Sequence, residues 1–360
     1  MSTAPCTADG PVLPRALTAA TLARLTPVSL VATPPVPFIA WGDLEGMRFA
    51  DPFFDQTIAR WTAGQPHPNT LRTPLDALAE FDHASGRDPC GLIFHMSRCG
   101  STLLSRLLAT MTQTLVISEP QPLNALLATA AGADEAALAD VLRNLIRALG
   151  CRRFGEQFYV LKLSSWNIRL LPVFRRAFPA ARIVFVQRAP AEVMASMHAD
   201  PPGWLALRQY PVWAELLFDG AAGANQPPDD DEVRAQSLKA ILAAARDAAD
   251  RGALIVDYNE LPAAAWRRVA AFLGITLTAD DVTRMQDEQR YYAKDAGRRL
   301  FTGDPPERRP RDPRRDALAA EIVEPVYRHL DDRRRAQIAM RGVAGSAPPL
   351  EYPAPPTAPL

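Results

Sequence analysis

The stretch that decides the fold class of this 360-residue chain is Leu92-Ile-Phe-His-Met-Ser-Arg98-Cys-Gly-Ser-Thr102-Leu-Leu-Ser-Arg-Leu-Leu108. Its short apolar run predicts a buried strand, and its later leucines, at helical spacing, predict a helix. The turn between them would point backbone N–H groups and the positive end of the helix dipole at one spot. Because Arg98, a glycine and two hydroxyl groups lie in this turn, we expect it to bind an anion.

Three more apolar runs follow, and each ends in one charged side chain. Glu119 ends the run 115–119, Lys162 ends 158–162, and Arg188 ends 181–188. Glu119 lies 21 residues after Arg98, a spacing that fits a strand–helix–strand unit. Ligands of open parallel sheets bind at the carboxyl ends of the strands. We therefore predict an α/β fold with a central parallel sheet, in which these four side chains converge on one cleft.

Three segments resemble those of the sulfotransferases that use 3′-phosphoadenosine 5′-phosphosulfate (PAPS). Residues 97–104 resemble the 5′-phosphosulfate loop, in the Arg-bearing version of the bacterial and protein-tyrosine branches. Residues 187–196 resemble the 3′-phosphate segment, in which an Arg and a Ser eight residues later hold that phosphate. Residues 118–121 resemble the segment that carries the general base in these branches. The resemblance covers about residues 89 to 340.

The resemblance implies a P-loop NTPase-like three-layer fold with an N-terminal extension. It implies transfer of the sulfuryl group of PAPS to a hydroxyl or amine, with Glu119 as general base. Lys162 would contact the sulfuryl group, Arg98 would hold the 5′-phosphate, and no metal would be needed. The residues expected to bind the co-substrate are Arg98, Cys99, Gly100, Ser101, Thr102, Arg188, Ser196, Lys294 and Arg299.

Two positions depart from the branch that acts on phenols and steroids. The histidine base of that branch is replaced by Ser164, and its adenine-stacking Trp is replaced by Leu103. Adenine must therefore stack on another aromatic ring, and Trp166, Tyr291 and Phe301 remain open as candidates.

Composition is consistent with an enzyme that acts on small ligands. A net charge of zero and a pI of about 7.0 argue against a nucleic-acid partner. No apolar stretch approaches 18 residues, and residues 1–13 lack a signal-peptide pattern. The cysteines show no C-x-x-C spacing and the histidines no metal-ligand spacing, so we expect a cytoplasmic protein without a metal. Carbohydrate, lipid, small-phenol and peptide acceptors, and an oligomer, all stay open.

The chain divides into four predicted parts. Residues 1–37 would form a mobile arm, and 38–88 an N-terminal cap or a segment packed on the main domain. Residues 89–340 would form the sulfotransferase domain, and the proline-rich residues 345–360 a disordered tail. Within the main domain, the basic stretch 291–315 would either close over the 3′-phosphate or remain solvated surface.

Other interpretations stay open at this point. A small-molecule phosphotransferase would need the Lys of G-x-x-x-x-G-K-[ST], which is missing here, although Asp257 could end a magnesium-binding strand. A non-catalytic nucleotide-binding module would need neither Glu119 nor Lys162. Glu119 could instead pair with Arg98 and only order the loop, in which case His95 is the next candidate base. Cys99 could be an activated thiol or a small buried side chain.

Overall fold

A computed structural model describes residues 25–32, 37–44, 46–64, 70–80, 86–130, 132–151, 154–218, 229–301 and 311–343. Most of the expected arm and the whole expected tail lie outside these residues. The described helices include none that is long and apolar enough to cross a membrane.

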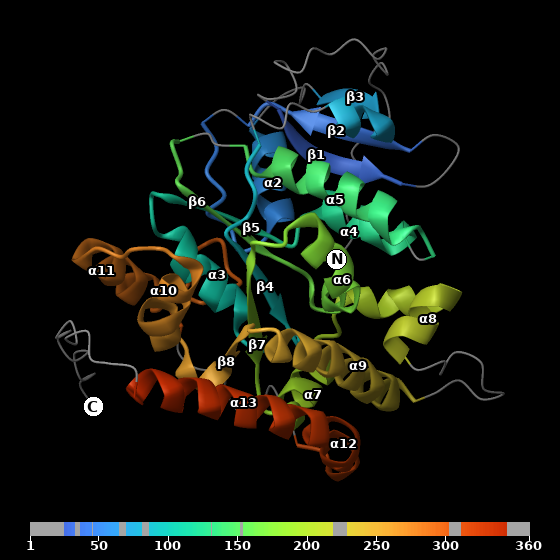
Figure 1. Ribbon diagram of the computed structural model, residues 1–360, viewed down its shortest axis with the longest axis vertical. Coiled ribbons are helices and arrows are strands. Elements are labelled where there is room, and N and C mark those ends of the chain that lie inside the picture. Colours follow the sequence, from blue (N-terminus) through green and yellow to red (C-terminus); the bar gives the residue numbers. More distant parts are fainter. Residues whose placement is uncertain are drawn as a thin grey trace.

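A five-stranded parallel sheet forms the centre of the molecule (Figure 1). Its strands run in the order β5-β6-β4-β7-β8, and every neighbouring pair is parallel. Their bounds are β4 Gly91–His95, β5 Thr114–Ser118, β6 Phe158–Lys162, β7 Arg182–Gln187 and β8 Leu254–Asp257. Nearly all of their residues are buried, as expected for a sheet covered on both faces. The predicted α/β fold is confirmed.

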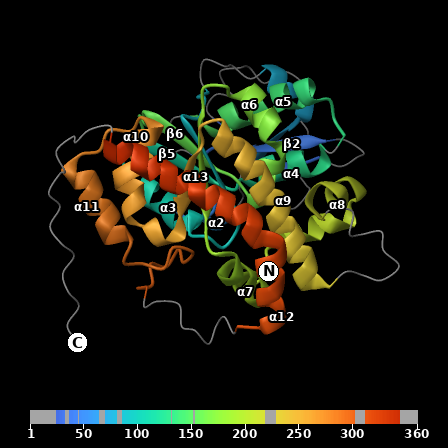
Figure 2. The ribbon, with the colours of Figure 1, turned by 60° about the horizontal axis from the view of Figure 1, so that its bottom comes forward.

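Helices cover both faces of this sheet and make the fold three-layered (Figure 1). On one side lie α3 (Ser101–Ala109), α10 (Ala270–Leu273) and α11 (Ala279–Glu288). On the other lie α4 (Gln121–Thr129), α5 (Glu135–Leu149), α6 (Leu171–Ala177) and α9 (Asp230–Asp250). In Figure 2, α13 (Glu324–Val343) runs beside α9, and it also packs on β8.

The remaining helical elements are short and connect these layers. They are α7 (Pro190–Ala199), α8 (Pro211–Phe218), α12 (Pro313–Leu318), the 3₁₀ turns η1 (Leu75–Glu80), η2 (Ser165–Leu170), η3 (Gly203–Gln209) and η5 (Tyr258–Glu260), and the π-helical turns η6 (Ala265–Val269) and η8 (Ala319–Val323).

A second, antiparallel sheet precedes the parallel one. It contains β1 (Thr26–Val31), β2 (Phe38–Gly42) and β3 (Thr70–Pro74), and α2 (Phe54–Ala63) lies between β2 and β3 in the chain. Strand β1 falls inside residues 1–37, which we expected to be a mobile arm. That boundary needs correction, because β1 pairs with β2 along its length and packs on α4. The apolar residues of this segment show only weak periodicity, so the sequence did not predict the strand.

Gln121 joins the two sheets at the free edge of β1. Its side-chain amide accepts a hydrogen bond from the Leu30 N–H at 3.1 Å and donates one to the Leu30 carbonyl at 3.1 Å. The amide therefore satisfies both backbone groups of an edge residue that is 2% exposed. Because Gln121 begins α4, two residues after Glu119, this contact attaches the N-terminal segment close to the predicted site.

Replacing Gln121 should separate this contact from general packing. We expect Gln121→Met to lower the free energy of unfolding by about 1–3 kcal/mol, since a buried donor and acceptor lose their partners. Chemical denaturation measures the change. Gln286→Met on α11 is the control and should have little effect. An equal loss in both variants would contradict a specific role for the Leu30 contact.

Candidate active site

A cavity of about 1120 Å³ opens at the carboxyl ends of the parallel strands. The segments that follow β4, β5, β6 and β7 all contribute to its walls, where the sequence placed the cleft. Nine of the predicted site residues line it: Arg98, Cys99, Gly100, Ser101, Thr102, Glu119, Arg188, Ser196 and Lys294. Lys162 lies buried behind the wall, and Arg299 is not among the lining residues.

The turn after β4 has an unusual backbone. The φ angles of Ser97, Arg98 and Gly100 are 78°, 49° and 82°. They lie in the left-handed region, which residues other than glycine rarely adopt. At Gly100 a side chain is also excluded by space, because a Cβ atom would lie 2.7 Å from the ring of Tyr258. Strained residues of this kind persist where the surrounding structure holds them, often at ligand sites.

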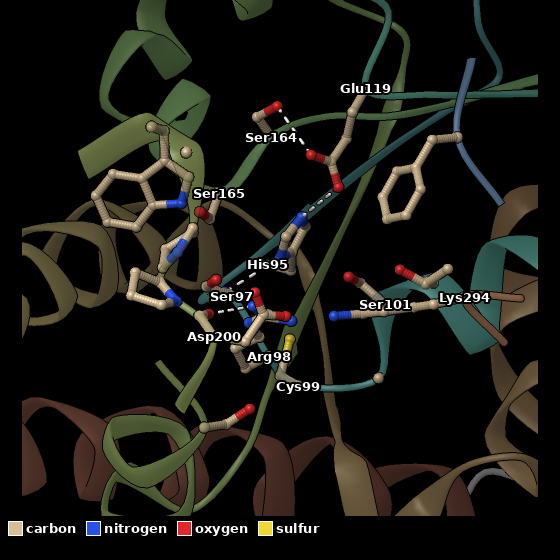
Figure 3. Close-up of a pocket in the computed structure, with 18 of the residues that line it drawn as sticks. His95, Ser97, Arg98, Cys99, Ser101, Glu119, Ser164, Ser165, Asp200 and Lys294 are labelled. Atoms are coloured by element: carbon tan, nitrogen blue, oxygen red, sulfur yellow. Dashed lines mark hydrogen bonds and ion pairs between the residues drawn. The ribbon is translucent and has the colours of Figure 1, made fainter. Parts of the chain in front are cut away.

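Arg98 does not pair with Glu119, contrary to one of our alternatives. Its guanidinium binds both the carboxylate and the backbone carbonyl of Asp200, the residue that follows α7 (Figure 3). Its Nε atom is buried and has no hydrogen-bond partner in the described part of the chain. An Arg with donors to spare, next to a turn of N–H groups, can bind an anion in place of the Asp200 carboxylate.

Glu119 has a different cationic partner, Lys162. Its Oε1 atom accepts a hydrogen bond from the Lys162 ammonium. Its Oε2 atom accepts one from the Ser164 hydroxyl at 3.1 Å (Figure 3). Burial favours the neutral acid, but the charge and hydrogen bond of Lys162 and the neighbouring His95 together outweigh it and hold the pKa of Glu119 well below its usual range. The carboxylate is therefore ionised, and it is a weak base while Lys162 stays in contact.

Lys162 is the last residue of β6 and is fully buried. Besides Glu119, its Nζ atom lies 3.4 Å from the Thr102 hydroxyl and 4.9 Å from the centre of the Phe53 ring. It thus connects the anion-binding turn, the residue after β5 and the N-terminal segment. A buried ammonium needs such partners, because an unpaired charge in this position would be very costly.

The hydrogen bonds of His95 define its tautomer. Its Nδ1 atom accepts a hydrogen bond from the Ser97 N–H at 3.1 Å, so in the neutral ring the proton is on Nε2. Nε2 lies 3.5 Å from Oε1 of Glu119 (Figure 3). Burial lowers the pKa of His95, which keeps the ring neutral at physiological pH. His95 therefore orients Glu119 and leaves the negative charge on the carboxylate.

Arg188 and Ser196 lie on the same side of the cavity as the anion-binding turn. The Arg188 guanidinium pairs with Glu192 at 2.5 Å and stacks on the Tyr258 ring at 4.0 Å. Tyr258 is also the ring that packs against Gly100. Ser196 lies on α7 and is buried at the cavity wall. The two segments that resemble phosphate-binding loops are thus linked through one tyrosine.

In the described part of the basic stretch 291–315, Lys294 is the cation that lines the cavity. Burial, and after it the positive charge of Arg98, lowers the pKa of Lys294 to about 8. Arg299 is largely exposed and lies 3.7 Å from Asp295, while Arg298 binds Glu288. Residues 302–310 of the stretch lie outside the described chain.

Of the two alternatives for Cys99, an activated thiol or a small buried side chain, the structure supports the second. Its Sγ atom donates to the Val186 carbonyl at 3.1 Å, and burial raises the pKa of the thiol to about 11. The thiol therefore stays protonated. Its place in the turn leaves only its backbone available to an anion.

The three candidate adenine platforms all line the cavity, but at different places. Tyr291 and Phe301 come from the segment that carries Lys294. Trp166 is 3% exposed and packs edge-on against Trp213, with ring centres 4.7 Å apart. Little of its face is available for stacking.

Sequence reasoning missed two residues that the N-terminal segment brings into the cavity, Phe53 and Asp55. Neither belongs to a motif, and both precede the main domain by more than thirty residues. Among the described residues, no group of three or more His, Cys, Asp or Glu side chains is arranged to hold a metal ion.

No protein-family model and no curated protein matches the chain. Among solved structures, sulfotransferase STF9 of Mycobacterium avium is similar at 13% identity and a TM-score of 0.43, over 74% of this chain and 80% of that one. A sulfotransferase of Alicyclobacillus acidocaldarius is similar at 16% identity and 0.39, over 69% and 96%. Sulfotransferase STF1 of Mycobacterium tuberculosis is similar at 16% identity and 0.39, over 69% and 78%.

The lowered pKa of Lys294 predicts how anion binding depends on pH. An anion binds the protonated lysine, whose population in the free protein declines as pH rises past about 8. We expect affinity for adenosine 3′,5′-bisphosphate to fall above pH 8, by up to about tenfold per pH unit. Calorimetric titration from pH 7 to 10 measures it. Lys294→Met should bind more weakly with no such decline. If the affinity of Lys294→Met fell in the same way above pH 8, the pH dependence would come from another group.

Proposed function

We propose that the protein is a PAPS-dependent sulfotransferase that transfers the sulfuryl group to a hydroxyl or amine of an acceptor. One observation carries the proposal. The two segments that resemble the 5′-phosphosulfate and 3′-phosphate loops border a single cavity, with the pair Glu119 and Lys162 beside them. A turn that only connected a strand to a helix would not require the cations of both segments and the pair Glu119 and Lys162 around one cavity.

The charge distribution supports an anionic co-substrate. Arg98, Arg188 and Lys294 are the Lys and Arg side chains that line the described cavity. The mutual repulsion of Arg98 and Lys294, which is part of the reason for the lowered pKa of Lys294, would be relieved by a phosphate between them. In this proposal Arg98, Lys294 and the N–H groups of the turn bind the 5′-phosphosulfate, and positive charge there stabilises the phosphate as it leaves.

Arg188 and Ser196 are proposed to bind the 3′-phosphate. The stacking of Arg188 on Tyr258 and its ion pair with Glu192 fix the plane of the guanidinium, so its remaining donors are oriented before the ligand arrives. A nucleotide without a 3′-phosphate would leave these donors unused. The site would therefore select PAPS over ATP.

Glu119 is proposed as the general base, with Lys162 controlling its strength. While Lys162 is bonded to it, the carboxylate is a poor proton acceptor because its pKa lies far below neutral. If Lys162 turns toward a sulfuryl oxygen, the pKa of Glu119 rises, since burial then dominates. The base would gain strength only when the co-substrate is present.

A phosphotransferase gains no support from the geometry. Asp257, the residue that could have ended a magnesium-binding strand, is buried and bonded to the Asn259 N–H at 3.0 Å and to the Tyr327 hydroxyl at 3.0 Å. It does not line the cavity.

Nucleotide selectivity tests the proposal directly. Adenosine 3′,5′-bisphosphate at 100 times its Kd should stabilise the protein by about 2.7 kcal/mol, and ATP with magnesium at the same concentration by much less. Thermal unfolding followed by fluorescence measures both. Equal or larger stabilisation by ATP would favour a phosphotransferase.

Arg188→Ala should separate the two phosphate positions. We expect it to weaken binding of adenosine 3′,5′-bisphosphate by about 10- to 100-fold, since a charged hydrogen-bond partner is lost, with little change for adenosine 5′-phosphate. Arg208→Ala, which removes an exposed Arg paired with Asp230, is the matched control and should bind both nucleotides normally. Equal weakening of both nucleotides in Arg188→Ala would make Arg188 a structural residue.

Two variants test the base, once a screen with labelled PAPS and a metabolite extract has supplied an acceptor. Glu119→Gln should keep its nucleotide affinity and lose about 10²–10⁴-fold in turnover. Lys162→Met should turn over slowly, and the acidic limb of its pH–rate profile should move to higher pH. The reason is that burial raises the pKa of Glu119 once the ammonium is gone. An unmoved limb would show that another group accepts the proton.

A further inference from the structure

The cavity has two chemically different ends. Figure 3 shows Lys294 and Ser101 on one side of it and Ser164 and Ser165 on the other. The first side carries Lys294 and the start of α3, and Arg98 lies between the two sides with its guanidinium on Asp200. The second side is formed by α4, η2 and the segment around η3. Helix α8 holds these elements together, because its Trp213 donates a hydrogen bond to the Ala128 carbonyl of α4 and packs against Trp166 of η2, and α8 also contacts η3. We call this second side the acceptor end.

Aromatic rings and uncharged groups make up most of the acceptor end. Trp166 of η2, Trp204 of η3 and Tyr210 directly after η3 line it, and Phe53 of the N-terminal segment lines the cavity beside Lys162. The cations of the described lining are Arg98 in the turn, Arg188 in the 3′-phosphate segment and Lys294 in the basic stretch 291–315, and none of them comes from α4, η2 or η3. An anionic acceptor would therefore find no counter-charge at this end.

Asp55 adds a carboxylate that the proposed sulfuryl transfer does not use. It lies in the first turn of α2, lines the cavity, and accepts a hydrogen bond from the backbone N–H of Gln121. That bond places the Asp55 carboxylate at the start of α4, two residues beyond Glu119. In the described residues no Lys, Arg or His forms an ion pair with Asp55.

The electrostatics of Asp55 are those of a carboxylate without a counter-ion. Burial, together with the negative charge of Glu119, raises the pKa of Asp55 to about 6. Asp55 is surrounded by protein atoms, which cause this shift, but the residue keeps exposed surface. Because it lines the cavity, a ligand can reach that surface. At neutral pH it remains mostly ionised, and a cation beside it would be stabilised.

Two further oxygen atoms of the cavity lining lack partners. Oδ1 of Asn124, one turn along α4 from Gln121, and Oγ of Ser165 are buried with no hydrogen-bond partner in the described chain. Both residues line the cavity. An ammonium group offers three N–H donors and no acceptor, so it matches a site built from oxygen atoms.

We propose that the acceptor carries a protonated amine, which Asp55 binds at the aromatic acceptor end while the acceptor hydroxyl faces Glu119. The acceptor class is then an amino-alcohol or a phenol with an aminoalkyl side chain. Aromatic faces favour a cation as well as an apolar body, so both parts of such a molecule are accommodated. The proposal rests on the proposed function, since it assigns the second substrate of the same site.

Three phenols of similar shape test this charge preference without requiring turnover. Tyramine carries an ammonium, 4-ethylphenol is neutral, and 3-(4-hydroxyphenyl)propanoate carries a carboxylate. Each is titrated calorimetrically into the protein saturated with adenosine 3′,5′-bisphosphate. Tyramine should bind about 10-fold or more tighter than 4-ethylphenol, as expected for a hydrogen bond to a charged group. The propanoate should bind most weakly.

Variants of Asp55 assign the preference to one side chain. Asp55→Asn retains an oxygen for the Gln121 N–H, and it should bind tyramine and 4-ethylphenol within about threefold of each other. Asp55→Glu should keep part of the preference. Asp76→Asn, which alters an exposed carboxylate of the same segment outside the cavity, should bind all three as the parent does.

The outcomes are distinguishable from failure of the proposed function. Absence of adenosine 3′,5′-bisphosphate binding would reject the sulfotransferase, and tyramine titrated alone would still test Asp55. Equal binding of the three phenols, no binding of tyramine at millimolar concentration, or an unchanged preference in Asp55→Asn would each overturn the ammonium site.

Discussion

The ion pair between Glu119 and Lys162 joins the carboxyl ends of the neighbouring strands β5 and β6, and the cavity is organised around it. Lys162 is fully buried, so its charge must be matched by a nearby carboxylate and by the hydroxyl of Thr102. That requirement fixes the side chain after β5 relative to the turn after β4. The Ser164 hydroxyl also donates to Glu119, and Nε2 of His95 lies 3.5 Å from its carboxylate. A small rearrangement of one ammonium would change the basicity of the carboxylate, which makes the pair suited to a reaction that starts only when an anion arrives.

Charge is distributed unevenly across the cavity. Arg98, Arg188 and Lys294 surround the turn, whereas Asp55 and Glu119 lie toward the aromatic end. Opposite fields at the two ends favour an anionic co-substrate at one and a neutral or cationic second ligand at the other. In the absence of ligand, Asp200 partly neutralises Arg98. A phosphate that replaced this carboxylate would exchange one anion for another at the same guanidinium, so the site can remain electrostatically balanced before and after binding.

The N-terminal segment is part of the site as well as of the fold. Its small sheet is attached through Leu30 and Gln121, and its helix α2 begins at the cavity with Phe53 and Asp55 beside the two strand ends. Phe53 covers the Lys162 ammonium at 4.9 Å, and Asp55 bonds the start of α4. These contacts connect the stability of the segment to the geometry of the chemistry, because movement of the sheet would displace both side chains from the cavity.

The sequence by itself determined what depends on neighbouring residues along the chain. The apolar runs before Arg98, Glu119, Lys162 and Arg188 predicted the four strands, and parallel-sheet geometry then placed these residues at one edge. The anion-binding turn was equally visible, since its glycine, cation and hydroxyls are contiguous. Only the tertiary structure decided the partners. Glu119 pairs with Lys162 and not with Arg98, and Arg98 pairs with Asp200. The tertiary structure also brought Asp55 into the cavity. Such contacts join segments far apart in the chain, and no local periodicity records them. The same reason explains why β1 escaped prediction, because its order comes from pairing with β2 and from Gln121 rather than from a pattern of its own.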